Sequence, residues 1–372
     1  MSKKVVAVLF GGRSTEHDVS KRSAATIMAA MSDEKYRILP IYITKAGKWM
    51  LFEGAIENMY NSQALTGDQW EKFGTPVVFS PDTTQKGILR LVGEKFKLIP
   101  VDIVFPVLHG ANGEDGRIQG LCELAGIPYV GCNLLSSAAC MDKAFTKIVV
   151  NALKIAQADH VLCLRHEIEN NLAEACKRVR YKIGYPCFVK PANAGSSVGV
   201  SKAADKKELE TALRLAARYD RKVLVEKAIV GRELECAVLG NTDATASVVG
   251  EVLAAADFYD YEAKYHNAES QSVIPADIPP DKAEEIRGAA LAIYKALDCS
   301  GFSRVDFFLE NGTNKVIFNE INTIPGFTTI SMYPKLWNAA AIDTDMLVDK
   351  LITLAVERAD EDANATSREA AE

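Results

Sequence analysis

The chain has 372 residues, of which 48% are hydrophobic and 25% are charged, and its formal net charge is −6. These values are ordinary for a soluble globular protein of two or three domains, and they exclude collagen-like, coiled-coil and disordered chains. The mild negative charge also lacks the basic character that general binding of nucleic acid requires.

The C-terminal end holds most of that charge. Residues 357–372 carry six acidic and two basic side chains, a net charge of −4, so the rest of the chain sums to only −2. A short charged end of this kind is typical of a solvated tail rather than of a binding site. We therefore predict a disordered acidic tail over residues 359–372.

The cysteines and the apolar runs indicate the compartment. Eight cysteines are scattered without a Cys-x-x-Cys pair and without zinc-site spacing to the five histidines. This pattern predicts free, mostly buried thiols in a reducing compartment. No stretch approaches the roughly 20 apolar residues that a membrane span needs. The expected location is therefore cytoplasmic, with no membrane or nucleic-acid partner.

The first third of the chain predicts an α/β domain. Residues 4–10 (KVVAVLF) are a continuous β-branched run, followed by a Gly-Gly turn and a helix to about residue 30. Further buried strands are expected at 37–43 and 102–108, in a doubly wound pattern. The sequence GGRSTE lacks the Gly-x-Gly-x-x-Gly spacing of a dinucleotide site. An open sheet of this kind still predicts a small ligand at the carboxyl ends of its strands.

Two polar residues lie at that edge of the predicted sheet. Glu16 stands at the start of the first helix, where the helix dipole alone would favour a carboxylate. The alternative is a group that pairs with a substrate ammonium. His109 lies in the glycine-rich loop 106–120, and a lone histidine there is more often a hydrogen-bonded structural residue than a catalyst.

The middle of the chain contains a glycine-rich hairpin. Residues 188–200 (FVKPANAGSSVGV) predict two strands around a turn whose small residues leave N–H groups and hydroxyls open to phosphate oxygens. Lys190 adds positive charge beside this turn. A P-loop is excluded because Gly-x-x-x-x-Gly-Lys-Ser/Thr is absent. Such turns most often only connect strands, so the signal is weak alone. Residues 223–229 predict a further strand, and 257–265 an ordered loop.

The strongest local signal is a hairpin near the C-terminal end. Apolar strands around Arg304 and Glu320 flank an Asn-Gly turn at 311–312. Residues two apart in a strand share a face, so Asp306, Glu320 and Asn322 converge if the two faces match. Oxygen ligands of this kind suit Mg²⁺ or Mn²⁺. The alternative is an Arg–carboxylate pair on a solvated face, but the apolar flanks favour the metal.

Eight sequence blocks follow one another from about residue 4 to about residue 355. They are GGRSTEHDVS, LHGANGEDGRIQG, CMDK, KPANAGSSVGVSK, EKAIVGRELECAVLG, DFYDYEAKY, GFSRVDFF and NEINTIPGFTTISMYPKLW. Together they resemble the D-alanine–D-alanine ligases of the ATP-grasp fold. The resemblance implies an α/β chain that is α+β in its ATP-grasp part. The implied domains are a Rossmann-like pre-ATP-grasp domain (1–137), a central ATP-grasp subdomain (138–227), a C-terminal ATP-grasp subdomain with the metal site (228–358) and the tail (359–372).

The resemblance also implies an activity. It is the ATP-dependent joining of two D-alanines through a D-alanyl phosphate, for peptidoglycan precursors and the cell wall. D-Ala-D-Ser and D-Ala-D-lactate ligases remain alternatives, since Met332 occupies a position that varies among these enzymes. Tyr265 favours the dipeptide, because lactate users carry histidine there. A homodimer formed through the N-terminal domain is expected.

Site residues follow from the matching positions. Lys143 and Lys190 would reach the ATP phosphates, and Asp306, Glu320 and Asn322 would bind two Mg²⁺ or Mn²⁺ ions. The other implied ATP contacts are Gly195, Ser197 and Val198 over the phosphates, Glu226, Lys227 and Ile229 at the adenine, and Glu233 at the ribose. The implied catalytic and substrate contacts are Glu16 with Ser196 and Tyr265 for the first D-alanine, Arg304 and the Gly326 N–H for an oxyanion, and Ser331, Lys264, His109 and Met332 around the second D-alanine.

Two other classes of protein are weighed against this one. Carboxylase-type ATP-grasp enzymes lack the EHDVS and YEAKY blocks, both of which are present here. A non-catalytic nucleotide-binding relative would be expected to lose its metal ligands or Arg304, and this chain retains them. Both alternatives are therefore weaker than the ligase.

Overall fold

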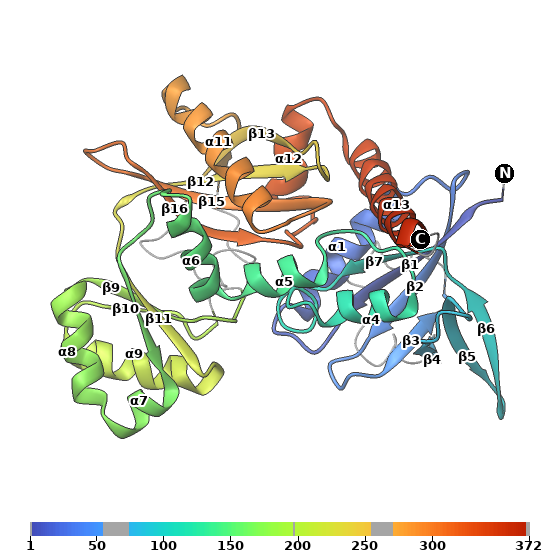
Figure 1. Cartoon of the computed structure of the whole chain (residues 1–372), viewed down its shortest axis with the longest axis horizontal. Helices are drawn as coiled ribbons and strands as arrows, with labels where there is room; N and C mark the ends of the chain where they lie inside the picture. The colour runs from blue at the N-terminus through green and yellow to red at the C-terminus, as the bar shows by residue number, and fades with distance from the viewer. Residues whose placement is uncertain (1, 55–73, 196–197, 254–270, 370–372) are drawn as a thin grey trace.

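The computed structural model describes residues 2–54, 74–195, 198–253 and 271–369, which form three β-sheets with packed helices (Figure 1). The predicted loop 257–265, together with Ser196, Ser197, Lys264 and Tyr265, lies outside these residues. Within the described part, no helix is both long and apolar enough to cross a membrane.

The first sheet is built around a strand that is buried on both faces. Strand β1 (Lys4–Gly11) pairs in parallel with β2 (Tyr36–Ile43) and β7 (Ile103–Val107). Alternate residues of β1 enter different core clusters, which explains its continuous apolar run. Helix α1 (His17–Ala30) covers one face. These elements confirm the strands and the helix predicted in this region.

The same sheet continues through antiparallel strands that the doubly wound expectation did not include. Its full order is β6-β5-β4-β3-β2-β1-β7, and only the three strands around β1 are parallel. Several side chains of β4, β5 and β6 are exposed, so these three strands lack the apolar run that identified β1, while β3 is apolar but only four residues long. The added strands are β3 (Trp49–Phe52), β4 (Gly74–Phe79), β5 (Gly87–Val92) and β6 (Lys95–Pro100).

A second, four-stranded sheet carries the glycine-rich hairpin. Its order is β10-β9-β11-β8, and all its pairings are antiparallel. The hairpin is confirmed, with Ser201 opposite Val189. The strands are β8 (His160–Leu164), β9 (Cys187–Pro191), β10 (Ser201–Ala203) and β11 (Lys222–Lys227). The helices that accompany this sheet are α7 (Arg165–Asn170), α8 (Leu172–Lys182) and α9 (Lys206–Tyr219). Three helices precede it in the chain, namely α4 (Arg117–Ala125), α5 (Leu134–Met141) and α6 (Lys143–Ala152).

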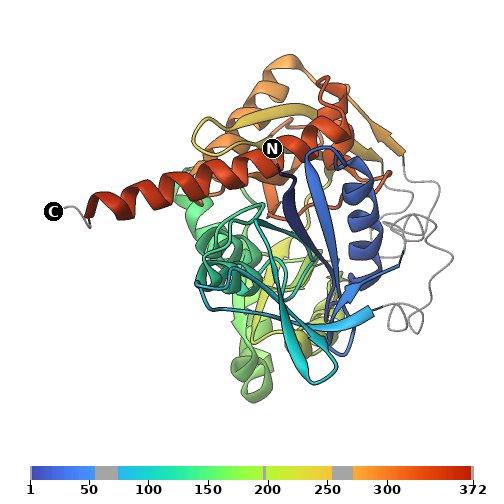
Figure 2. The same ribbon diagram turned by 90° about the vertical axis from the view of Figure 1, so that its right-hand side faces the viewer.

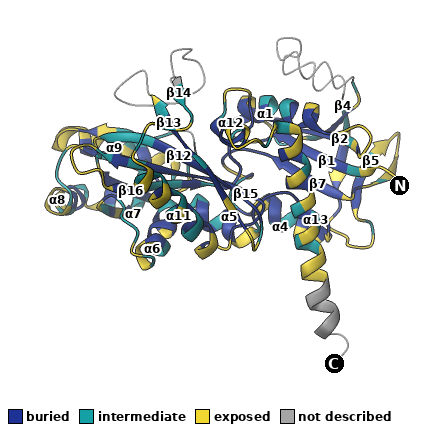
Figure 3. Ribbon diagram, turned by 90° about the horizontal axis from the view of Figure 1, so that it is seen from above, coloured by how far each residue is buried: buried dark blue, intermediate teal, exposed yellow. Residues whose placement is uncertain are grey.

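The third sheet holds the C-terminal hairpin at its edge. Its order is β14-β13-β12-β15-β16, again antiparallel throughout. Figure 3 shows that its central strands are mostly buried, as are those of the first sheet. The strands are β12 (Gly231–Leu239), β13 (Thr245–Leu253), β14 (Gln271–Val273), β15 (Phe302–Glu310) and β16 (Val316–Asn322), and its helices are α11 (Pro280–Ala296) and α12 (Met332–Ala339).

The last helix connects the third sheet back to the first. Helix α13 (Thr344–Glu369) buries Leu347, Leu351 and Ile352 in a core cluster shared with α1. The structure differs from the predicted disordered tail, because α13 continues as helix to Glu369. Residues 359–369 contain three alanines and two glutamates, which are strong helix formers. Figure 2 shows the end of α13 extending away from the body of the protein.

Candidate active site

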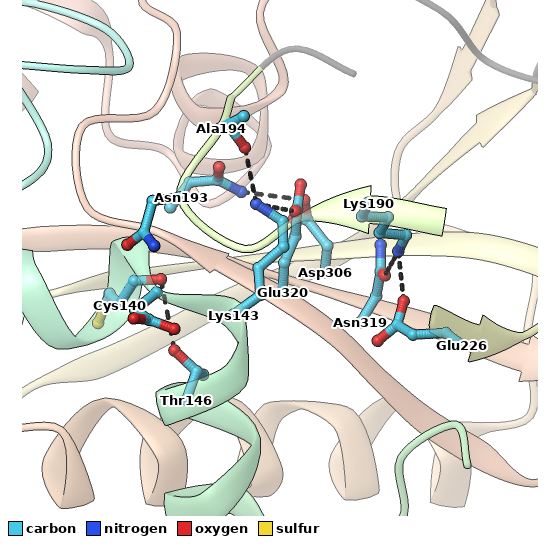
Figure 4. Close-up of polar contacts among 12 residues, drawn as sticks. Cys140, Lys143, Thr146, Lys190, Asn193, Ala194, Glu226, Asp306, Asn319 and Glu320 are labelled. Atoms are coloured by element: carbon cyan, nitrogen blue, oxygen red, sulfur yellow. Dashed lines mark hydrogen bonds and ion pairs between the residues drawn. The ribbon is translucent and has the colours of Figure 1, made fainter. Parts of the chain in front are cut away.

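Lys143 lies where the second and third sheets face each other (Figure 4). Its backbone N–H donates to the Ala192 carbonyl at 3.1 Å, at the end of β9. Its Nζ donates to the Ala194 carbonyl at 2.9 Å and lies 3.5 Å from Glu320 Oε2 on β16. The glycine-rich turn and the hairpin of β15 and β16, which we call the acidic hairpin, therefore contact the same ammonium group. This contact places a positive charge between them.

A buried charge cluster stands beside it. Lys190 Nζ lies 2.5 Å from one oxygen of Glu226, and Lys147 Nζ lies 2.6 Å from the other. Lys190 also donates to Asn319 Oδ1 at 3.4 Å. Burial alone would raise the pKa of Glu226, but the two ammonium groups outweigh it and hold that pKa at about 2. Likewise, burial lowers the pKa of Lys190, and the attraction of Glu226 more than restores it.

Replacing Glu226 by glutamine is expected to lower the free energy of unfolding by about 3–5 kcal/mol at pH 7, because two buried ammonium groups lose their partner. Since the folded pKa of Glu226 is depressed, its stabilising effect is present above the ordinary pKa of about 4.5 and is lost as the pH falls toward 2. The difference in the free energy of unfolding between wild type and Glu226→Gln should therefore shrink as the pH falls over that range.

Denaturant titration between pH 7 and pH 3 measures this difference in the free energy of unfolding. Glu284→Gln is the matched control, because its carboxylate is 71% exposed and pairs with Arg287 at the surface. Equal stability of wild type and Glu226→Gln at pH 7 would contradict the ion pairs described here.

The acidic hairpin has the geometry that side-chain alternation predicted. Asp306 stands opposite Glu320, and Arg304 stands opposite Asn322. Arg304 donates from Nε and Nη2 to both carboxylate oxygens of Asp306 at 2.7 Å, and Asn322 Nδ2 donates to Asp306 at 3.1 Å. Glu235 on β12 adds a contact of 2.9 Å to Arg304. Burial lowers the pKa of Arg304, but these carboxylates raise it well above its usual range.

The donor chemistry of this hairpin fits a divalent cation. Asp306 and Glu320 are carboxylates on one face, and Asn322 adds an amide oxygen. Such oxygen donors are those that Mg²⁺ prefers. Within the described ranges, no three His, Cys, Asp or Glu side chains lie close enough to hold an ion by themselves. A bound cation would therefore need oxygens from Asn322 and from a phosphate-bearing ligand.

Glu16 is held between glycines from two different sheets. A methyl group on Gly110 or on Gly195 would lie 2.6 Å from Glu16 Oε2. The structure thus brings the helix-entry loop of the first sheet against the glycine-rich turn of the second. Glu16 itself is 7% exposed. A side chain at either glycine would therefore displace the Glu16 carboxylate from its present position.

Glu114 belongs to the same region and was missed in the sequence analysis. Its two carboxylate oxygens accept N–H bonds from Gly110 at 2.6 Å and from Ile324 at 3.1 Å. Removal from water, and then the nearby charge of Glu16, raise the pKa of Glu114 to about 8. The only sequence signal was an acidic residue inside a glycine-rich loop.

Gly326 and Ser331 meet in the loop after β16. A methyl group on Gly326 would lie 2.9 Å from Ser331 Oγ, which accepts an N–H bond from Thr328 at 3.0 Å. Met332 follows Ser331 but turns into the core, where its Cε would meet a methyl group on Gly250. Its buried side chain packs among core residues.

The remaining expected residues lie on or beside all three sheets. Glu226 is buried at the end of β11, Lys227 is exposed, and Ile229 and Val198 are half-buried. Glu233 is half-buried on β12, and its charge acts on Lys190. His109 is buried, with both ring nitrogens bonded to protein atoms.

Two antiparallel sheets that hold a glycine-rich turn, two lysines and an acidic hairpin between them define an ATP-grasp protein. Residues 5–132 match the family model described as D-ala D-ala ligase N-terminus, and residues 149–353 match D-ala D-ala ligase C-terminus. The chain belongs to the D-alanine–D-alanine ligase family. The expected family and fold class are thereby confirmed.

Named relatives and solved structures agree with this assignment. The D-alanine–D-alanine ligases of Caldicellulosiruptor bescii and Clostridium acetobutylicum are each 49% identical, and the alignments cover 96% of this chain and 96% and 99% of those proteins. The VanG D-Ala:D-Ser ligase of Enterococcus faecalis has a TM-score of 0.85 at 42% identity, covering 95% of this chain and all of that one. The Coxiella burnetii D-alanine–D-alanine ligase has a TM-score of 0.85 at 35% identity, covering both chains fully.

Proposed function

We propose that this chain is an ATP-dependent ligase that joins two D-alanines into D-alanyl-D-alanine for peptidoglycan precursors. The observation that carries the proposal is the placement of Lys143, which contacts both the glycine-rich turn and Glu320 of the acidic hairpin. Phosphate transfer needs positive charge between the β- and γ-phosphates. The names of the relatives supply the substrate class.

ATP is proposed to lie between the second and third sheets. Lys143 and Lys190 would neutralise its phosphates beneath the glycine-rich turn, with N–H and hydroxyl groups of Gly195, Ser197 and Val198. Glu226, Lys227 and Ile229 would line the adenine pocket. The half-buried Glu233, close enough to act on Lys190, would take the ribose hydroxyls.

Divalent ions are proposed to bind Asp306, Glu320 and Asn322 together with the ATP phosphates. When bound, such ions neutralise negative charge that shifts between phosphate oxygens during transfer. Both Mg²⁺ and Mn²⁺ suit these oxygen donors. Because Glu320 also approaches Lys143, its side chain would hold a protein cation and a metal ion in the same site.

The chemistry proceeds in two steps in this proposal. The carboxylate of the first D-alanine, whose ammonium would pair with Glu16 together with Ser196 and Tyr265, attacks the γ-phosphorus. The bond to the β,γ-bridging oxygen breaks, ADP leaves, and an acyl phosphate forms. The deprotonated amine of the second D-alanine then attacks the acyl carbon, and phosphate leaves. Arg304 and the Gly326 N–H would stabilise the oxyanion of that second step.

Ser331 and Lys264 are proposed to hold the carboxylate end of the second D-alanine. Met332 would influence this pocket by packing against it from the core side, because its side chain is buried in the core. D-serine and D-lactate are the alternative second substrates, and one solved relative is named as a D-Ala:D-Ser ligase. Competition among D-alanine, D-serine and D-lactate, read by the mass of the product, discriminates them.

The domain limits 1–137, 138–227 and 228–358 remain our proposal, and each of the three sheets falls within one of them. A cytoplasmic location is proposed as well. The use of ATP supports it, and so do the eight cysteines, which are all free and buried.

A homodimer through the N-terminal part is proposed from exposed apolar side chains on neighbouring helices. Leu124 on α4 and Leu135 on α5 are 68% and 63% exposed. We expect the wild type to sediment at twice the monomer mass and Leu124→Glu/Leu135→Glu to sediment as a monomer. Tyr181→Glu, at a 94% exposed site on α8, is the control. A monomeric wild type, or a dimeric double variant, would refute this interface.

Phosphate release from ATP tests the proposed activity. It should require D-alanine and a divalent cation, and D-alanyl-D-alanine should accumulate in equal amount. Release that L-alanine supports equally well, or that D-alanine does not stimulate, would overturn the proposal.

A further inference from the structure

The loop that follows β16 is fastened to the first sheet by three side chains. Ser23 Oγ accepts the Phe327 N–H at 3.1 Å, and His109 Nδ1 lies 2.9 Å from the Ile324 carbonyl. Glu114 Oε1 accepts the Ile324 N–H at 3.1 Å. Both polar backbone groups of Ile324 and the N–H of Phe327 are thus bonded to side chains from the other end of the chain.

These bonds form a directed chain. A carbonyl can only accept, so Nδ1 of His109 donates to Ile324. In the neutral ring Nε2 accepts from the Ser23 hydroxyl at 3.0 Å, in the protonated ring it donates to that hydroxyl, and in both states the Ser23 oxygen accepts from Phe327. Ser23, His109, Ile324 and Phe327 are all buried. Water therefore cannot readily replace a lost partner, and the loop depends on these contacts for its position.

We infer that Ser23, His109 and Glu114 are positioning residues that set the place of the Gly326 N–H. We call these three side chains the loop clamp. The inference rests on the proposed function, because it assigns Gly326 to the oxyanion of the second step. It also gives His109 a role other than contact with the second D-alanine.

The position of Gly326 explains why a clamp would matter. It lies between Ile324 and Phe327, the two residues that the clamp holds. An oxyanion donor acts only when it is aimed at the place where charge develops, and a displacement of about 1 Å can cost roughly 10²-fold in rate. The Thr328–Ser331 bond fixes the loop on its other side.

The loop clamp also connects two substrate sites. The second carboxylate oxygen of Glu114 accepts the Gly110 N–H at 2.6 Å, and Gly110 packs against Glu16. One side chain therefore holds the loop of the proposed first-substrate residue and the loop of the proposed oxyanion donor. Glu114 therefore links the positions of those two loops through hydrogen bonds within the protein.

Ser23→Ala tests the clamp through its effect on the two chemical steps. ATP labelled at the β,γ-bridge oxygen reports acyl phosphate formation by positional isotope exchange, while product mass reports dipeptide formation. We expect dipeptide formation to fall roughly 10- to 100-fold in the variant. Isotope exchange should stay within about twofold of wild type, since Gly326 acts only in the second step.

Two further measurements keep the result decisive. Glu114→Gln, which keeps the side-chain volume, should slow both isotope exchange and dipeptide formation, because Glu114 also holds the Gly110 loop beside Glu16. Amide hydrogen exchange at residues 324–327 should accelerate in both variants, independently of turnover. Ser137→Ala is the matched control, because Ser137 is a buried serine bonded to the Cys132 carbonyl away from the loop.

The outcomes separate the clamp from the proposed function. A wild type that makes no dipeptide contradicts the proposed function, whereas the hydrogen-exchange readout still tests the clamp. Equal loss of both steps in Ser23→Ala, dipeptide formation within twofold of wild type in that variant, or unchanged hydrogen exchange at 324–327 in both variants would each overturn the clamp.

Discussion

Glu320→Gln is expected to lower dipeptide formation by about 10²- to 10³-fold while the protein stays folded. The substitution keeps the volume of the side chain but removes the charge that stands opposite Asp306 and 3.5 Å from Lys143. The proposed metal ligand and the partner of the proposed phosphate-binding lysine are then lost together, and ligand-sphere interactions are worth several kcal/mol in transfer reactions.

Steady-state rates over a range of Mg²⁺ concentrations measure this effect. The variant should need more metal for half-maximal activity, which a purely structural role would not produce. Glu310→Gln is the matched control on the same hairpin, where the carboxylate contacts Thr313 at the far end. Activity within tenfold of wild type at unchanged metal demand would refute the assignment of Glu320.

Arg304→Lys should have an effect of similar size, with a different signature. Lysine keeps the positive charge but cannot reproduce the two parallel bonds to Asp306. The oxyanion would lose a fixed donor, which typically costs about 10²–10³ in kcat. The KM for ATP should change little, because Arg304 is not among the proposed ATP contacts.

Arg232→Lys is a close control for that substitution. Arg232 lies on β12 and also holds a carboxylate with two bonds, to Glu251 on β13. It should lose comparable stability without loss of kcat. If both arginine variants lost activity equally, or if Arg304→Lys kept more than about a tenth of wild-type kcat, the oxyanion role of Arg304 would be contradicted.

The acidic hairpin was predictable because its signals are local. Alternation along two short strands and an Asn-Gly turn were enough to place Asp306, Glu320 and Asn322 on one face, and the strand register confirms that arrangement. Strand β1 was predictable for a similar reason, because burial on both faces requires a continuous apolar run. The family resemblance added roles, and those remain proposals.

Other features depend on contacts that no local pattern reveals. Glu114 bonds two backbone groups, one of which is 210 residues away, so nothing in its neighbourhood marks it. The flexible side chain of Met332 fills the space over Gly250, a contact that no local pattern reveals, and its place beside the second substrate stays a prediction. The outer strands β4–β6 are partly exposed and lack a continuous apolar run, and β3 is apolar but only four residues long. The end of α13 is helical because its composition favours helix as well as solvation.

Stereospecific phosphate release is the measurement that tests the central claim most directly. ATP, Mg²⁺ and the full-length protein are incubated with D-alanine or with L-alanine, and released phosphate and product mass are followed together. We predict release with D-alanine only, with one D-alanyl-D-alanine formed for each phosphate. Release without dipeptide, equal release with L-alanine, or no stimulation by D-alanine would contradict the claim that this chain joins two D-alanines.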